Sequence, residues 1–410
     1  RGVSVRLCEM KPSQHSPAHH SDDFAELVCS NSLRSDELTN AAGLLKEELR
    51  RLDSLILSCA DANRVEAGGA LAVDREAFAA AVTEKIRNHP NIEVVYGEVT
   101  EIPEGRVVIA SGPLTSDTLF DAIHARVGGD FLHFYDAAAP IVTAESIDMD
   151  SAYEASRYGK GTADYINCPF SREEYDAFWN ALTAEEAPVH GFEDSKVFEG
   201  CMPIEVNARR GYDTLRFGIL KPIGLPDPKT GKDPYAVLQL RRDNANGTLY
   251  NLVGCQTHLK FGEQKRVFSM IPALRNAEFV RYGVMHRNTF LDSPRLLDAT
   301  YALKAEPRIR FAGQMTGVEG YIESTASGWT AGVAAAMEVL GRPMPQLDRF
   351  TAVGALASYI SDHTVTKFQP MNINFGIIEP LGCKIKGKRE KNAKISERAL
   401  ERIESLKGEL

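Results

Sequence analysis

Two cysteines stand in sequence contexts that favour chemistry. Cys29 ends the short apolar run LVC and is followed by Ser-Asn-Ser, residue types that hydrogen-bond to nearby backbone in turns. Cys201 lies in EGCMPIE, where Pro203 ends the local element. The thiolate form of cysteine is a strong nucleophile, provided that a substrate can reach it. Both contexts are typical of thiols exposed at the end of an element.

The remaining five cysteines differ from these two. We interpret Cys8, Cys59 and Cys168 as small core residues, and we assign no role to Cys255 and Cys383. Seven cysteines without CxxC spacing argue against a disulfide framework and against a structural zinc site, which favours a reducing cytoplasm.

Three histidines near the start of the chain, His15, His19 and His20, have no further His or Cys ligand at a useful spacing. We therefore predict no metal site, and we interpret this segment as a polar loop over a cofactor. No apolar run is long enough for a membrane span, so we predict no membrane partner.

Three segments fit one nucleotide-binding architecture. Glu9 follows an apolar strand, where an acidic residue could accept hydrogen bonds from ribose hydroxyls, although a surface glutamate fits equally well. VVIASGPLTSD contains Gly112, whose missing Cβ suits close approach to a cofactor. RIRFAGQMTGVEGYIESTASGWTAG predicts a strand that ends at Gly313, a turn, and a helix of small residues whose N-terminus can bind a phosphate or a flavin carbonyl. The FAD-binding residues expected from these segments are Glu9, Lys11, Gly112, Gly313, Gln314, Gly317 and Tyr321.

The elements around these segments predict an α/β fold: a Rossmann-like, two-nucleotide-fold domain of the glutathione-reductase type with an inserted mixed α/β domain. A buried strand spans 3–8, and helices span 40–57 and 74–86, the second capped by Asp74. The strings TLRFGIL and YAVLQLRR predict short strands in the middle of the chain. We expect FAD-binding parts at 1–150 and 291–410, with a substrate and tRNA domain at 151–290 between them.

The chain lacks the G-x-G-x-x-G turn that follows the first strand of such a fold. We expect that one strand, this glycine loop and part of a helix are missing upstream of Arg1.

Charge is unevenly distributed along the 410 residues. The net charge of −9 disfavours a nucleic-acid partner, but nine basic residues against four acidic ones lie between Lys384 and Lys407. A solvated helix with ion pairs would explain this segment, as would contact with a polyanion. The candidate RNA-binding residues are Lys384, Lys386, Lys388 and Arg389.

Several long strings together resemble the bacterial folate- and FAD-dependent tRNA (uracil-5-)-methyltransferases over essentially the whole chain. The strings are VCSNSLRSDELTNAAGLLKEELRRLDSL, GGALAVDREAFA, FEGCMPIE, YGVMHRNTF and FAGQMTGVEGYIES. The resemblance implies that 5,10-methylenetetrahydrofolate gives a one-carbon unit to C5 of a T-loop uridine in tRNA. It implies that reduced FAD supplies the electrons and that NAD(P)H reduces the flavin.

The resemblance also implies roles for residues. Cys201 would attack C6 of the uracil, and Cys29 would handle the C5 proton or guard the flavin-bound methylene, although the two roles could be exchanged. His286, Arg287 and Asn288 would contact folate, the ring by stacking and the arginine by pairing with carboxylates; a hydrogen-bonded interior cluster is the other interpretation.

Three other functions remain open. A related FAD- and folate-using enzyme modifies the wobble uridine of tRNA, but it carries a long helical C-terminal domain that is absent here. A non-catalytic flavin-containing RNA-binding protein would not need paired thiols. A plain NAD(P)H–flavin oxidoreductase would not need the basic C-terminal segment.

Overall fold

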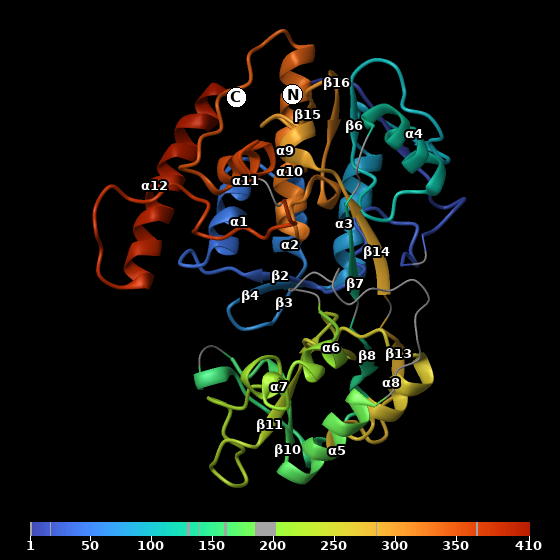
Figure 1. The fold of residues 1–410 in the computed structure, drawn as a ribbon, viewed down its shortest axis with the longest axis vertical. Coiled ribbons are helices and arrows are strands. Elements are labelled where there is room, and N and C mark those ends of the chain that lie inside the picture. Colours follow the sequence, from blue (N-terminus) through green and yellow to red (C-terminus); the bar gives the residue numbers. More distant parts are fainter. Residues whose placement is uncertain are drawn as a thin grey trace.

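The computed structural model describes residues 2–16, 18–128, 132–137, 139–159, 162–184, 202–283, 285–365 and 368–410. Two lobes contain its hydrophobic cores (Figure 1). We call the described residues of 2–128 and 290–410 the first lobe, and those of 139–283 the inserted lobe. The strands β7 (Leu132–Ala137) and β14 (Met285–Phe290) pair antiparallel and carry the chain between the two lobes.

The first lobe combines short parallel strand pairs with a layer of helices. Its strands are β1 (Val5–Glu9), β2 (Ser32–Ser35), β3 (Arg64–Val65), β4 (Ala70–Val73), β5 (Ile92–Tyr96), β6 (Val107–Ile109), β15 (Ala302–Leu303) and β16 (Glu306–Phe311). Its α-helices are α1 (Ala41–Arg51), α2 (Leu55–Ala62), α3 (Arg75–Arg87), α4 (Asp117–Val127), α9 (Ser293–Leu296), α10 (Tyr321–Val339), α11 (Ala352–Ser361) and α12 (Lys388–Glu409). The pairs β1–β5 and β6–β16 are parallel, as an α/β nucleotide-binding fold requires.

The inserted lobe is built on one antiparallel sheet with the strand order β13-β8-β12-β11-β10-β9. Its strands are β8 (Ile141–Thr143), β9 (Tyr153–Glu154), β10 (Tyr165–Phe170), β11 (Ala236–Arg242), β12 (Leu249–Leu252) and β13 (Phe279–Arg281). Its α-helices are α5 (Arg172–Thr183), α6 (Ile204–Arg209), α7 (Thr214–Phe217) and α8 (Phe261–Phe268). Aromatic rings from β10 and α5 fill its core, with Phe170 and Phe178 centroids 5.4 Å apart.

Local signals placed several elements correctly. The Asp74 carboxylate accepts a hydrogen bond from the Ala77 amide at 3.0 Å and caps α3, as expected of an aspartate at that position. YAVLQLRR contains β11, and RIRFAGQ contains the end of β16. Cys59 and Cys168 are buried, which confirms their interpretation as core residues.

Three expectations about elements are wrong. Strand β1 is not buried: Val5, Arg6 and Cys8 are exposed because β5 is its single partner in the described part of the chain. The expected helix 40–57 is two helices, since Asp53 takes a left-handed φ of 57° and Ser54 caps α2. TLRFGIL forms α7 and a turn rather than a strand, because Gly218 ends the helix.

Two charged side chains of α1 lie inside the first lobe. Lys46 is fully buried, and its Nζ donates to the carbonyls of Leu33 at 2.9 Å and Ser35 at 2.6 Å. The Glu48 carboxylate accepts hydrogen bonds from the first two amides of α11, at 2.7 and 2.9 Å. Burial raises the pKa of Glu48 to about 8 and lowers the pKa of Lys46 to about 8. No described helix has the length and apolar character needed to cross a membrane.

The raised pKa of Glu48 makes stability depend on pH. Between about pH 4.5, the ordinary pKa of this carboxyl, and about pH 8, the folded protein binds more protons than the unfolded chain. Stability contributed by Glu48 must therefore fall as pH rises through that window. We expect the free energy of unfolding of the wild type, relative to Glu48→Gln, to fall by about 1 kcal/mol or more from pH 5 to pH 8, since each unit of pKa shift corresponds to about 1.4 kcal/mol.

Urea unfolding at the two pH values measures this difference. Glu47→Gln is the control, because the Glu47 side chain is partly exposed and faces Arg51 at 3.1 Å. If the difference in free energy of unfolding between the wild type and Glu48→Gln is the same at both pH values, the raised pKa of Glu48 is contradicted.

Candidate active site

Two glycine-containing turns meet at one edge of the first lobe. Strands β6 and β16 run in parallel with Phe311 opposite Ile109, so the residues that follow them, including Gly112 and Gly313, leave the sheet at the same edge. Both glycines have a left-handed φ, 73° and 78°. A Cβ on Gly112 would meet no atom within 4 Å, and one on Gly313 would come no closer than 4.0 Å to Ser324. The backbone is therefore open to close approach by a ligand.

The turn into α10 is held by its own side chains. The Ser327 hydroxyl accepts a hydrogen bond from the Gly313 amide at 2.7 Å, and the Gln314 amide donates to Glu319 at 2.7 Å. Gly317 has a φ of 82°, and Gly320 precedes the helix with a φ of 111°. This turn leads into the N-terminus of a 19-residue helix, which carries a partial positive charge.

Glu9 and Lys11 lie at the end of β1, as expected. One Glu9 carboxylate oxygen accepts from the Lys11 amide at 3.0 Å, and the buried Lys11 ammonium donates to the Asp23 carbonyl. Glu9 is only partly buried, so its carboxylate is accessible to a ribose. Lys11 thereby ties this strand end to the loop that leads toward Cys29.

Cys29 lies beside the start of α10. Its backbone amide donates to the Tyr321 hydroxyl at 2.9 Å, although the two residues are 292 positions apart in the chain. The pKa of Tyr321 is raised, mainly by burial and to a lesser extent by the nearby Cys29 thiol, so the phenol stays protonated. The loop around Cys29, which we call the thiol loop, is thus bonded to the N-terminus of α10. The structure brings together Cys29 and Tyr321, which the sequence predicted separately.

A second contact joins the same loop to α10. The Arg34 guanidinium reaches the Glu323 carboxylate at 2.7 Å, and the Ile373 amide donates to the same oxygen at 2.9 Å. Burial raises the pKa of Glu323. Arg34 has a left-handed φ of 67°, an uncommon conformation for a non-glycine residue. Sequence reasoning missed this pair, although Arg34 lies in the same motif as Cys29.

The loop also contacts the inserted lobe. Arg241, at the end of β11, donates to the side chains of Ser30 at 2.7 Å and Asn31 at 3.1 Å. Arg75 donates to the carbonyls of Leu27 and Cys29 from the other side. Sequence reasoning assigned no role to these arginines. The available signal was a charged pair, Arg241-Arg242, at the end of a strand that is otherwise apolar.

Four predicted site residues cannot be placed by their side chains. Cys201 lies outside the described residues, and the side chains of His286, Arg287 and Asn288 do as well. The backbone of the latter three belongs to β14.

The segment after Cys201 contains a buried polar cluster in the inserted lobe. Glu205 of α6 accepts from the Thr257 hydroxyl at 3.0 Å and the His258 amide at 2.7 Å, and the His258 ring Nδ1 lies 3.1 Å from it. Burial raises the pKa of Glu205. This cluster fixes the beginning of α6, which lies within the EGCMPIE motif, on the core of the inserted lobe.

The basic C-terminal segment comprises the stretch that carries Lys384 and Lys386 and most of α12, which begins at Lys388. All four candidate RNA-binding residues are exposed: Lys384, Lys386, Lys388 and Arg389. The helix is not fully solvated, because its apolar side, including Ile395 and Ile403, is buried in the core of the first lobe. Exposed cations on an anchored helix are compatible with either interpretation of this segment.

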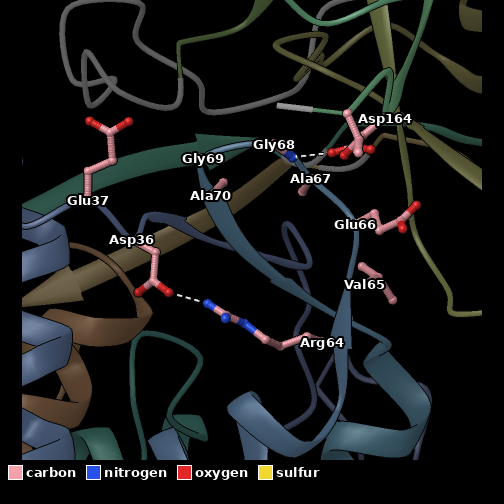
Figure 2. Close-up of a pocket in the computed structure, with 11 residues that line it drawn as sticks. Asp36, Glu37, Arg64, Val65, Glu66, Ala67, Gly68, Gly69, Ala70 and Asp164 are labelled. Carbon is pink, nitrogen blue, oxygen red and sulfur yellow. Dashed lines mark hydrogen bonds and ion pairs between the residues drawn. The ribbon is translucent and has the colours of Figure 1, made fainter. Parts of the chain in front are cut away.

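A pocket of about 490 Å³ opens where the β2–β4–β3 sheet meets the inserted lobe, and Figure 2 shows its lining. The lining residues are Asp36, Glu37, Arg64, Val65, Glu66, Ala67, Gly68, Gly69, Ala70, Thr162 and Asp164. Asp164 accepts from the Gly68 amide at 2.6 Å, and Arg64 pairs with Asp36. None of the predicted site residues whose side chains the structure describes lines it, and an excess of carboxylates repels phosphate. We therefore place the site at α10 and Cys29.

The fold and the glycine turns define a class of protein. The family model of Glucose inhibited division protein A matches residues 1–343. The structure of Aquifex aeolicus GidA in the form II crystal superimposes with a TM-score of 0.67 at 14% identity, over 93% of this chain and 67% of that one. The form I crystal gives a TM-score of 0.66 at 15% identity, over 93% and 70%. The molecule therefore has a GidA-like α/β fold.

Closer relatives narrow the class. The protein named methylenetetrahydrofolate–tRNA-(uracil-5-)-methyltransferase TrmFO from Acetivibrio thermocellus is 61% identical over 98% of this chain and 92% of its own length. Proteins of the same name from Bacillus licheniformis and Bacillus subtilis are 58% and 57% identical, each over 99% of this chain and 94% of their own length. The chain belongs to the TrmFO family.

Gly317 tests how much the turn before α10 depends on glycine. A Cβ there would lie 2.3 Å from the Phe368 ring, which packs against Phe290 and Tyr359 and has little room to move. We expect Gly317→Ala to lower the free energy of unfolding by about 2–4 kcal/mol, from left-handed strain plus overpacking.

Gly341→Ala is the matched control for denaturant unfolding. Gly341 also has a positive φ, 65°, but a Cβ there meets nothing within 4 Å. Strain alone should cost about 1 kcal/mol. Equal losses in the two variants would show that the Phe368 contact does not constrain the turn.

Proposed function

We propose that this protein transfers a methyl group to C5 of a uridine in tRNA, with 5,10-methylenetetrahydrofolate as the carbon donor and FAD as the cofactor. The observation that carries the proposal is full-length similarity, at 57–61% identity, to proteins whose names state this reaction. The wobble-uridine enzyme is disfavoured, because the relatives at 57–61% identity carry the name of the tRNA-(uracil-5-)-methyltransferase. A thiol loop bonded to the start of α10 supports an enzyme over a binding protein.

The first lobe fits an FAD. Glu9 would accept hydrogen bonds from the ribose, while the open space at Gly112 and Gly313 would admit the cofactor beside the backbone. The N-terminus of α10 would face the flavin, with Gln314, Gly317 and Tyr321 shaping the approach. When bound and reduced, FAD supplies the electrons that convert the transferred carbon into a methyl group.

The chemistry needs two groups from the protein. C5 of uracil is a weak nucleophile until a thiolate adds to C6, which forms an S–C6 bond and an enolate. After C5 has bonded to the one-carbon unit, a base must remove the C5 proton so that the S–C6 bond can break. We assign the attack to Cys201 and the proton to Cys29.

Three finer features complete the proposal. The uridine is that of the T-loop, NAD(P)H reduces the flavin, and His286, Arg287 and Asn288 contact the folate. Since tRNA is processed in the cytoplasm, we propose that compartment. Support for these features comes from the motifs in the sequence.

The two cysteines can be distinguished with tRNA that contains 5-fluorouridine, which has no C5 proton to lose. Cys201→Ala should abolish both methylation and the covalent adduct with this RNA. Cys29→Ala should abolish methylation and still form the adduct, because it acts after the attack. Gel-shift assays under denaturing conditions and mass spectrometry of the RNA measure both.

The reverse pattern of adducts would exchange the two roles. Normal methylation by both variants would contradict thiol chemistry altogether. Cys59→Ala is the control, since Cys59 is buried in the core of the first lobe and burial raises the pKa of its thiol.

The basic segment gives a separate test of the RNA substrate. Replacing Lys386, Lys388 and Arg389 by glutamate should weaken tRNA binding and make its salt dependence less steep, because fewer counterions are released. Flavin reduction by NAD(P)H should not change. The measurement is the affinity for tRNA at several salt concentrations. An unchanged affinity at low salt would show that this segment does not contact the tRNA.

A further inference from the structure

The segment 29–31 is held between the two lobes by a fully buried asparagine. The Asn31 side-chain nitrogen donates to the Val73 carbonyl of β4 at 3.0 Å and to the Arg242 carbonyl of β11 at 2.9 Å. Its side-chain oxygen accepts from the Arg241 guanidinium at 3.1 Å. Asn31, two residues after Cys29, therefore bridges β4 of the first lobe and β11 of the inserted lobe.

Arg241 reaches from the inserted lobe into this loop. Its side chain lies at the end of β11 with 7% of the residue exposed, and it donates to Ser30 Oγ at 2.7 Å as well as to Asn31. Burial lowers the pKa of Arg241, because desolvation disfavours the charged guanidinium. A buried guanidinium needs acceptors, and two of those available to it belong to the thiol loop. Its planar guanidinium holds the two acceptors in one rigid geometry, which the rotatable ammonium of a lysine does not impose.

Arg75 completes the clamp from the first lobe. Its guanidinium donates to the carbonyls of Leu27 and Cys29 and forms an ion pair with Asp243 at 2.8 Å. Asp243 follows Arg241 by two residues, so the end of β11 supplies both a cation for the loop and an anion for Arg75. Arg75 and Asp243 side chains are 12% and 4% exposed, which keeps water from competing for these bonds.

We propose that Arg241 is a positioning residue for the reaction: from the inserted lobe, it fixes the Cys29 loop through Ser30 and Asn31. The thiol of the first lobe then keeps a constant geometry relative to a base bound by the inserted lobe. This inference rests on the proposed function. Misplacement of a reacting group by about 1 Å can lower a rate on the order of 100-fold, so a clamp of this kind has a measurable consequence.

The test compares substitutions at two adjacent arginines. Arg241→Met removes both donors, and Arg241→Lys keeps the charge without the planar guanidinium. Arg242→Met is the matched control, because the Arg242 side chain contacts Glu66 and Tyr250 instead of the loop. Arg241→Met should lower kcat for tRNA methylation about 10- to 100-fold, while KM for tRNA and FAD content stay within about twofold of wild type.

Arg241→Lys should recover part of the lost kcat, and Arg242→Met should keep it. Hydrogen exchange of the segment around Cys29, measured by mass spectrometry, should become about tenfold faster in Arg241→Met than in Arg242→Met, since the loop loses two of its restraints. If Arg241→Met does not fold, Ser30→Ala, which removes a single acceptor, should show a smaller loss of kcat with the same unchanged KM.

Equal kcat in Arg241→Met and Arg242→Met would overturn the inference, and so would a loss of kcat in a folded Arg241→Met that follows loss of FAD. A wild type that does not methylate tRNA would instead contradict the proposed function. In that case the hydrogen-exchange measurement still shows whether Arg241 restrains the segment around Cys29, because it does not depend on activity.

Discussion

Buried charge at the contact between the lobes constrains the whole site. The guanidinium of Arg241 can be accommodated away from water only where acceptors are provided, and Ser30 and Asn31 provide two of them. The same loop supplies the carbonyls that Arg75 contacts. Sliding one lobe against the other would leave several buried polar groups without partners, so the arrangement of the lobes and the position of Cys29 are fixed together.

A different constraint acts at the start of α10. The chain leaves β16 through Gly313, Gly317 and Gly320, each with positive φ, and close contacts around the second and third leave no room for a side chain. The turn is therefore rigid although it is rich in glycine. Because the Cys29 amide donates to Tyr321 in the first turn of α10, the start of this helix and the loop around Cys29 share this rigidity. The loop around Cys29 is therefore held both by Arg241 of the inserted lobe and by Tyr321 at the start of α10.

Sequence reasoning predicted the elements around the candidate site but not the contacts that join them. A capping aspartate, a strand followed by glycine, and a helix of small residues are local signals, and the structure contains each of them. The contact between Arg241 and Asn31 joins residues 210 positions apart, so no local pattern could reveal it. For the same reason Cys8, on an apolar strand, was expected in the core and is exposed: burial depends on which elements cover a strand. The break at Asp53 was missed because helical spacing continues across it.

Helix α1 shows how far this dependence on buried polar groups extends. Its LLKEEL string has the composition of an exposed helix, yet Lys46 and Glu48 are both completely buried. Lys46 holds the carbonyls of Leu33 and Ser35, on either side of Arg34, which reaches Glu323 in α10. Replacing such groups by apolar ones could preserve stability, but it would remove the bonds that give β2 its geometry. The buried Lys46 of α1 therefore belongs to the framework of the site as much as the residues of the loop do.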